Sequence, residues 1–157
     1  ARTLWRTTVE ITGQPIKEIY TGKEIPLETL SIDHFVPRSY ISNDELWNLT
    51  PMSKALNSSK NNRLPVWDEF FEPFAKYQYY LYSLIFPTDK SKRSSVLIDR
   101  FEKCRKNNVN AIWASEILYI AGNSDIQFMN ILSYNLKPIY EAAQLQGYDM
   151  WKVNTQL

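Results

Sequence analysis

Hydrophobic positions divide the chain into two parts with different periodicity. Up to about residue 65, apolar residues form short runs between turn-forming residues, whereas from residue 66 onward they recur every three or four positions. The second pattern predicts helices that each bury one face, and we interpret these faces as core rather than as a groove for a partner. The recurring positions are Phe70, Phe74, Tyr77, Leu81 and Leu84, then Leu97, Phe101 and Cys104, and finally Phe128, Leu132, Leu136, Ile139 and Ala143.

Breaker and capping residues set the expected limits of these helices. Pro73 is expected to start or kink the first helix, because proline lacks the amide hydrogen that a helix interior needs. Asn110 is expected to cap a further helix that ends near Gly122. The last helix is expected over residues 125–146, with Gly147 closing it.

The first part of the chain predicts a strand, a loop, a second strand and a helix. Residues 30–36 form a β-like run that Pro37 ends, and the second short strand is expected within residues 44–50. Thr50 is expected to cap the helix, with Pro51 at its first position.

Length and composition fit one ordinary domain of 157 residues with 44% hydrophobic residues. The net charge of +1 gives a weak overall field, so contact with nucleic acid must rest on a local basic patch. The single cysteine, Cys104, excludes a disulfide within the chain and a zinc site built from cysteines. We find no signal peptide and no apolar run of membrane-spanning length, and therefore expect a cytoplasmic protein with no membrane partner.

The only histidine, His34, directly follows Asp33 in the first expected strand. Alone this pair is weak evidence, because a single histidine in an apolar run is more often structural than catalytic. In a strand–loop–strand–helix unit, however, the end of the first strand can face the helix, which would bring Asp33 and Asn57 together beside His34. Carboxylate and amide oxygens suit Mg²⁺ or Mn²⁺, and an imidazole exchanges protons near neutral pH. The three residues therefore predict a metal-dependent phosphodiester hydrolase.

The ββα-metal core of HNH endonucleases resembles the segment from Ser31 to Pro65, SIDHFVPRSYISNDELWNLTPMSKALNSSKNNRLP. The segment is most similar to the variant with Asp-His in the first strand and asparagine at both later positions, as in RNA-guided CRISPR nucleases and many bacterial defence nucleases. The preceding YTGKEI also resembles the lead-in of that branch, so the resemblance covers Tyr20 to Pro65. It does not extend to residues 66–157.

The resemblance implies a role for each matching residue. His34 would be the general base that activates water, and Asp33 and Asn57 would hold one Mg²⁺ or Mn²⁺ ion. Asn48 would orient the histidine or brace the loop through hydrogen bonds. These roles are what the family pattern implies.

Three basic residues near the motif are expected to contact backbone phosphates. Lys60 and Arg63 follow the last motif asparagine, and Arg38 follows the first strand. The alternative for each is a solvated surface charge with no role in binding.

Two features depart from common HNH proteins. Many members brace the fold with zinc held by cysteine pairs, which one cysteine cannot do, so we expect the helices of residues 66–157 to supply that support. The final ligand position holds asparagine rather than histidine, which favours Mg²⁺ over a transition metal.

The resemblance thus implies an α+β fold, with a small antiparallel ββα-metal unit and its lead-in (residues 1–65) packed on a helical extension (residues 66–157) in a single compact domain. It implies an endonuclease that cuts DNA, expected to be double-stranded, with specificity supplied by a larger parent chain or a partner protein. A restriction or anti-phage defence role would follow by analogy. The alternatives are a nucleic-acid-binding or scaffold module without turnover, and an RNase or nickase that uses the same residues.

Overall fold

The computed structural model describes residues 1–106 and 111–153. Its helices and strands follow one another as α1 (Arg2–Thr12), β1 (Leu30–His34), α2 (Arg38–Ile41), β2 (Leu49–Ser53), α3 (Lys54–Lys60), β3 (Leu64–Pro65), α4 (Trp67–Ile85), α5 (Ser95–Lys106), α6 (Asp125–Leu145) and β4 (Met150–Trp151). Short helical turns lie at Leu27–Thr29, Leu46–Asn48, Lys90–Lys92 and Ala114–Leu118. Among the helices of the two described ranges, none is long and apolar enough to cross a membrane.

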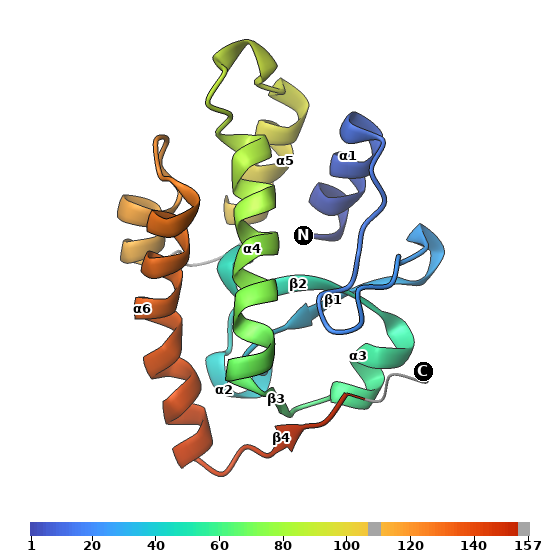
Figure 1. Ribbon diagram of the computed structural model, residues 1–157, viewed down its shortest axis with the longest axis vertical. Coiled ribbons are helices and arrows are strands. Elements are labelled where there is room, and N and C mark those ends of the chain that lie inside the picture. Colours follow the sequence, from blue (N-terminus) through green and yellow to red (C-terminus); the bar gives the residue numbers. More distant parts are fainter. Residues whose placement is uncertain (107–110, 154–157) are drawn as a thin grey trace.

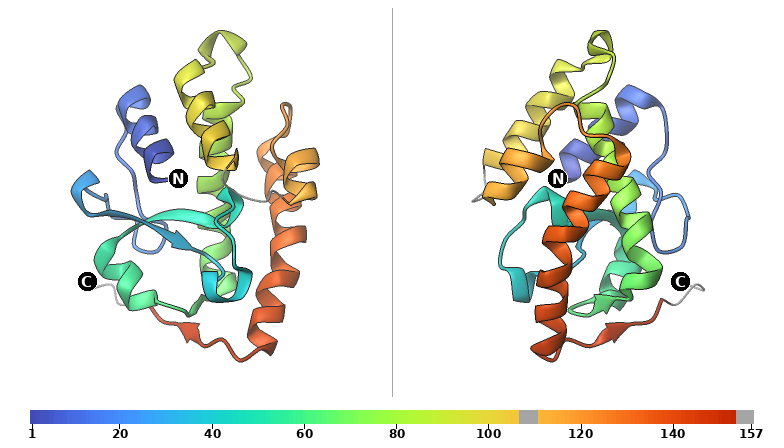
Figure 2. Two further views of the ribbon diagram at one scale, coloured as in Figure 1. Left: turned by 180° about the vertical axis from the view of Figure 1, so that it is seen from behind. Right: turned by 60° about the vertical axis from the view of Figure 1, so that its left-hand side comes forward.

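A small ββα unit forms one end of the molecule. β1 and β2 pair antiparallel, with Asp33 opposite Thr50 and His34 opposite Leu49. α3 follows β2 directly and packs against both strands (Figure 1; Figure 2, left). The helices α4, α5 and α6 make up most of the remainder, which confirms the expected α+β class and the mostly helical second part.

The limits of the second strand and of α3 differ from those expected. β2 begins at Leu49, so Thr50 and Pro51 belong to the strand and not to the start of the helix. Proline is tolerated there because the sheet has two strands, and one edge of β2 needs no amide donor. The helix starts three residues later, where the Ser53 side chain accepts a hydrogen bond from the Leu56 amide.

The long helices agree with the expected stripes, with one difference at the start of α4. α4 begins at Trp67, so Pro73 lies inside it instead of starting it. α6 begins with a capping box, in which Ser124 and Gln127 each accept a hydrogen bond from the other's backbone amide. The expected cap at Asn110 lies outside the described residues.

One helix, α1, had no counterpart in the predicted elements. It packs mainly against α5, and the ring of Trp5 stacks on that of Tyr77 in α4 at a centroid distance of 4.8 Å. Four of its eleven residues are threonine, whose branched side chain lowers helix propensity, so packing rather than propensity stabilises this helix.

α4 is the main support of the ββα unit. Phe35, directly after β1, is fully buried and stacks on Phe74 of α4 at a centroid distance of 4.3 Å. The buried Gln78 amide of α4 donates hydrogen bonds to the backbone carbonyls of Leu46 (3.1 Å) and Leu49 (2.6 Å). Through these contacts α4 holds the end of β1 and the start of β2.

The chain returns to the ββα unit at its C-terminal end through residues 148–151, which we call the C-terminal strap (Figure 1). β4 pairs parallel with β3. Trp151 is fully buried, packs edge-on against Tyr20 at 5.0 Å, and donates an indole hydrogen bond of 3.3 Å to the Ser59 hydroxyl. The strap therefore ties α3 to the lead-in of β1.

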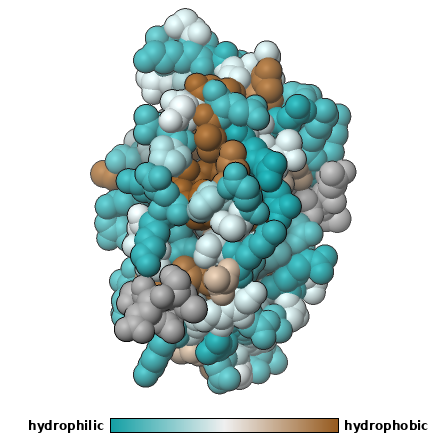
Figure 3. Space-filling model, turned by 90° about the vertical axis from the view of Figure 1, so that its right-hand side faces the viewer, coloured by the Kyte–Doolittle hydropathy of each residue, from teal (hydrophilic) through white to brown (hydrophobic). Residues whose placement is uncertain are grey.

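The surface on the side of α1 and α3 is mainly hydrophilic, and hydrophobic side chains are visible chiefly in a recess near its middle (Figure 3). A recess of this kind is ordinary for a small domain, because polar residues cannot cover the whole surface of a core.

Candidate active site

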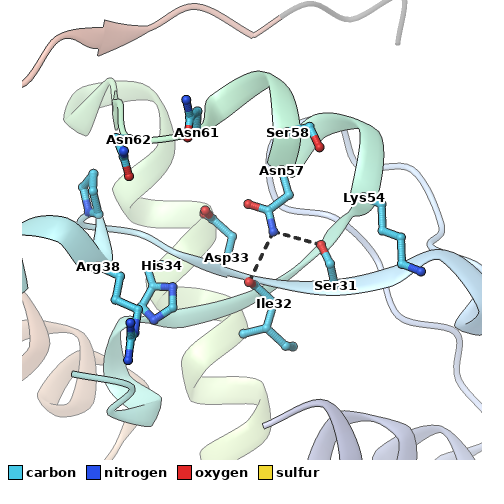
Figure 4. A pocket seen from close by; sticks show the side chains of 11 residues that line it. Ser31, Ile32, Asp33, His34, Arg38, Lys54, Asn57, Ser58, Asn61 and Asn62 are labelled. Atoms are coloured by element: carbon cyan, nitrogen blue, oxygen red, sulfur yellow. Dashed lines mark hydrogen bonds between the residues drawn. The ribbon is translucent and has the colours of Figure 1, made fainter. Parts of the chain in front are cut away.

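A cavity of about 480 Å³ opens between β1 and α3, with the start of α2 at its edge. Its lining is largely polar (Figure 4). The lining residues are Ser31, Ile32, Asp33, His34, Pro37, Arg38, Lys54, Asn57, Ser58, Asn61 and Asn62. Four of the residues singled out from the sequence are thus brought to one place: Asp33, His34, Arg38 and Asn57.

Asp33 lies on the interior side of the cavity and is almost fully buried. Its Oδ2 accepts a hydrogen bond of 3.0 Å from the Tyr20 hydroxyl, and its Oδ1 lies 3.1 Å from the Lys60 ammonium. We call Asp33, Tyr20 and Lys60 the inner network. Burial raises the pKa of the Asp33 carboxyl, and the Lys60 charge opposes that rise. Burial, and then the Asp33 charge, raises the pKa of Tyr20 well above its usual range, so its hydroxyl keeps its proton and donates it.

Lys60 does not lie where the sequence interpretation put it. Its side chain is 0% exposed, and its ammonium donates to Asp33 and, at 2.7 Å, to the backbone carbonyl of His34. A lysine is rarely buried without a partner, and here a carboxylate and a carbonyl provide one. In this arrangement Lys60 does not reach solvent, so the expected surface contact with phosphate is corrected to an internal ion pair.

Asn57 faces Asp33 across the cavity from the middle of α3 (Figure 4). Its amide nitrogen donates to the Ser31 hydroxyl at 3.0 Å and to the Ile32 carbonyl at 3.3 Å. These bonds fix the amide and leave its oxygen without a hydrogen-bond donor among the described residues.

The oxygen atoms of Asp33 and Asn57 fit a hard divalent cation. Each Asp33 oxygen accepts one bond from the inner network and keeps a further acceptor position, and the Asn57 oxygen accepts none within the described ranges. Mg²⁺ is commonly held by one or two carboxylates together with water and substrate phosphate. The described ranges contain no cluster of three His, Cys, Asp or Glu residues suited to a metal ion, so such a site would depend on the amide oxygen.

His34 stands at the outer edge of the cavity. Its Nε2 lies 2.7 Å from Oδ1 of Asp44, and the same oxygen accepts a 3.0 Å hydrogen bond from Nε of Arg38. We call His34, Asp44 and Arg38 the outer network. The hydrogen bond with His34, followed by the one with Arg38, lowers the pKa of Asp44 below its ordinary value.

Asn48 lies outside the cavity lining and is fully buried. Its side-chain oxygen accepts a 2.9 Å hydrogen bond from the Val36 amide, and its side-chain nitrogen donates a 2.9 Å bond to the Val36 carbonyl. This pair of bonds holds the chain just after β1. Of the two roles considered for Asn48, the contacts correspond to bracing the loop, with no direct bond to the imidazole.

The remaining basic residues are placed differently from one another. Arg38 lines the cavity, but its Nε is engaged by Asp44. Arg63 lies outside the lining and donates to the carbonyls of Lys60 and Ser59, where a cation stabilises the end of α3. Lys54, which the sequence reasoning did not select, lines the cavity from the first turn of α3.

Two further residues of the site were missed from the sequence. Tyr20 belongs to the lead-in that resembles the family, but nothing in its spacing showed a bond to Asp33. Asp44 lies in a polar loop whose path could not be predicted. The signal available for it was its residue type, a carboxylate shortly before Asn48.

Comparison with known families agrees with this geometry. A family model described as HNH endonuclease matches residues 18–66, which contain β1, β2, α3 and every side chain of the inner and outer networks. Neither the curated proteins nor the solved structures gave a match to the chain. The matched family is one of nucleases, so it implies a nucleic-acid substrate and, in general, use of a divalent metal ion. Segment 18–66 of the chain is thus similar to the HNH endonuclease family, and this match supports assigning the segment to it.

Proposed function

We propose that this protein is a divalent-metal-dependent endonuclease that hydrolyses phosphodiester bonds of double-stranded DNA, with His34 as the general base. The observation that carries the proposal is the convergence of Asp33, His34 and Asn57 on one cavity within a segment that matches HNH endonucleases. A restriction or anti-phage defence role is part of the proposal by analogy with such nucleases.

His34 is suited to take a proton from water. Its Nε2 is engaged by Asp44, whereas its Nδ1 has no hydrogen-bond partner among the described residues. An imidazole with one nitrogen held and one free acts as a base whose position is fixed by the held nitrogen. The attacking water would lose its proton to Nδ1 as it approaches the phosphorus atom.

Asp33 and Asn57 would hold the cation, one Mg²⁺ or Mn²⁺, with water and phosphate completing its ligands. When bound, the ion would stabilise the charge on the scissile phosphate and on the leaving oxygen. Asn48 supports this arrangement indirectly, because it braces the backbone that follows Asp33 and His34.

Positive charge for the DNA backbone would come from Lys54 and from the guanidinium nitrogens of Arg38 that have no partner among the described residues, both at the cavity. The bound region of DNA would extend beyond this small site, so we propose that a larger parent chain or a partner protein supplies sequence specificity. A division in which this site cleaves and another part recognises the sequence suits a cavity lined mainly by short polar side chains.

Cleavage of supercoiled plasmid by purified protein tests the proposal. We expect nicked or linear DNA with Mg²⁺ or Mn²⁺ and none with EDTA. His34→Ala should lower the single-turnover rate about 10²- to 10⁴-fold, the range for loss of a general base, while DNA binding persists. Glu72→Gln, which neutralises an exposed carboxylate paired with Lys76 on α4, is the matched control and should cleave at the parental rate.

The same assay separates the alternatives. Binding without cleavage at any metal concentration would favour the nucleic-acid-binding or scaffold module. Cleavage of RNA in place of DNA would correct the substrate, and products that remain nicked would identify a nickase. Full activity in EDTA would remove the metal from the mechanism.

A further inference from the structure

The contact between His34 and Asp44 involves a residue that is not among the motif positions of the family pattern. Asp44 lies in the loop between α2 and β2, ten residues after His34, and the two side chains meet at 2.7 Å. Among the described residues, the Asp44 carboxylate pairs with two side chains, those of His34 and Arg38. Asp44 therefore joins the catalytic candidate of β1 to the start of α2.

The chemistry of this contact determines which nitrogen of His34 carries a proton. An ionised carboxylate can only accept hydrogen bonds, so Nε2 must be the donor in the neutral ring. Arg38 also holds Asp44 in place, because its Nε donates to the same Oδ1 atom at 3.0 Å. The lone pair of the neutral imidazole is then on Nδ1.

We propose that Asp44 is a positioning residue that fixes the ring orientation of His34 and keeps its proton on Nε2, so that Nδ1 can act as the base. The inference rests on the proposed function, in which His34 activates water. The arrangement is the carboxylate–imidazole pair that hydrolases of unrelated folds use to hold a general base.

The solvent exposure of the outer network determines how much cleavage rate should be lost when Asp44 is replaced. The Asp44 side chain is 47% exposed and that of Arg38 is 64% exposed, so water competes for both bonds. Loss of the carboxylate should therefore cost less than it does in a fully buried pair. We expect Asp44→Asn to lower the single-turnover cleavage rate about 10- to 100-fold, as for other partners that orient a catalytic group.

A purely structural role for Asp44 would give a different result. If the carboxylate only braced its loop, its loss would change stability and leave the imidazole proton where it was. The tautomer and the hydrogen exchange of the ring are thus the readouts that separate positioning from bracing.

The chain offers an unusually clean measurement, because His34 is its only histidine. In protein labelled with ¹⁵N-histidine, the long-range ¹H–¹⁵N spectrum shows one imidazole, and at a pH where the ring is neutral it reports which nitrogen is protonated. The parental protein should show the proton on Nε2, exchanging with water more slowly than in Asp44→Asn. Asp44→Asn should speed that exchange and raise the share of the Nδ1-protonated form, since an amide can accept from or donate to Nε2.

Glu72→Gln is again the matched control, since it makes the same carboxylate-to-amide change in an exposed ion pair of 2.8 Å. Its imidazole spectrum and cleavage rate should equal those of the parent. Amide spectra of all three proteins, recorded in EDTA, verify that each is folded.

Each result decides the inference. A changed imidazole spectrum together with slower cleavage and unchanged DNA binding supports it. An imidazole spectrum in Asp44→Asn identical to that of the parent overturns it, and so does parental cleavage despite a changed tautomer. If the parent itself cleaves no nucleic acid, the proposed function fails, and the spectra still decide whether Asp44 positions the ring.

Discussion

Asp33 and His34 are neighbours in β1, yet their two networks lie in opposite environments. The inner network of Asp33, Tyr20 and Lys60 is closed off from water, whereas the outer network of His34, Asp44 and Arg38 lies at the surface. Both contain a carboxylate beside a cation at close to 3 Å. The two carboxylate–cation pairs are therefore alike in chemistry but differ in their access to water.

Burial explains the difference. A charge inside the protein loses its hydration, so each member of the inner network needs the others and can move little. A charge at the surface keeps water as an alternative partner, so the outer network contributes little to stability. In the proposed mechanism the group that holds a cation is fixed, and the group that exchanges protons stays accessible.

The largest effect should come from Lys60→Met, which keeps the length of the side chain and removes its charge. Asp33 would be left buried without a counter-charge, and we expect a loss of about 3–5 kcal/mol in the free energy of unfolding. Urea unfolding in the presence of EDTA measures this without a cation that could replace the ammonium. A loss below about 1 kcal/mol would mean that the inner network is open to water.

A smaller effect is expected for Tyr20→Phe, which removes one hydroxyl from the inner network. The Asp33 carboxylate would lose a single donor while Lys60 remains, which should cost about 1.5–3 kcal/mol, the usual range for a hydrogen bond to a charged group. Thermal and urea unfolding provide the measurement. An equal loss for Tyr20→Phe and Lys60→Met would show that the charge of Lys60 adds nothing to its hydrogen bond.

The smallest change in stability is expected for Arg38→Gln, in the outer network. The ion pair with Asp44 is exposed, so its loss should change the free energy of unfolding by less than about 1 kcal/mol. DNA binding should weaken. If Arg38 also contacts a phosphate, the slope of log binding constant against log salt concentration should become shallower by about one unit. An unchanged salt slope would assign Arg38 to Asp44 alone.

The ββα unit could be predicted from the sequence because its signals are local. Asp33, His34 and Asn57 were selected from residue type and spacing, and they do line one cavity. The start of α3 was misplaced because Thr50 and Pro51 are common at helix starts, and only the pairing of β2 with β1 shows that they lie in a strand.

The inner and outer networks could not be predicted in the same way. Lysine is almost always exposed, so composition favoured a surface position for Lys60, and its burial depends on how α3 packs on β1. The contact between Asp44 and His34 depends on the path of a loop, which no periodic pattern specifies. Side-chain pairs that join separate elements are a property of the assembled fold.

The C-terminal strap has a consequence for the order in which the site assembles. Trp151 packs edge-on against Tyr20, so one residue of the inner network is held by a side chain far along the sequence. Contacts between residues far apart in sequence require closure of a long loop, and such contacts slow folding. During synthesis the ββα segment leaves the ribosome well before Trp151. We therefore expect the pocket around Asp33 to mature last, after α4 and α6 have packed, which would delay nuclease activity until folding is complete.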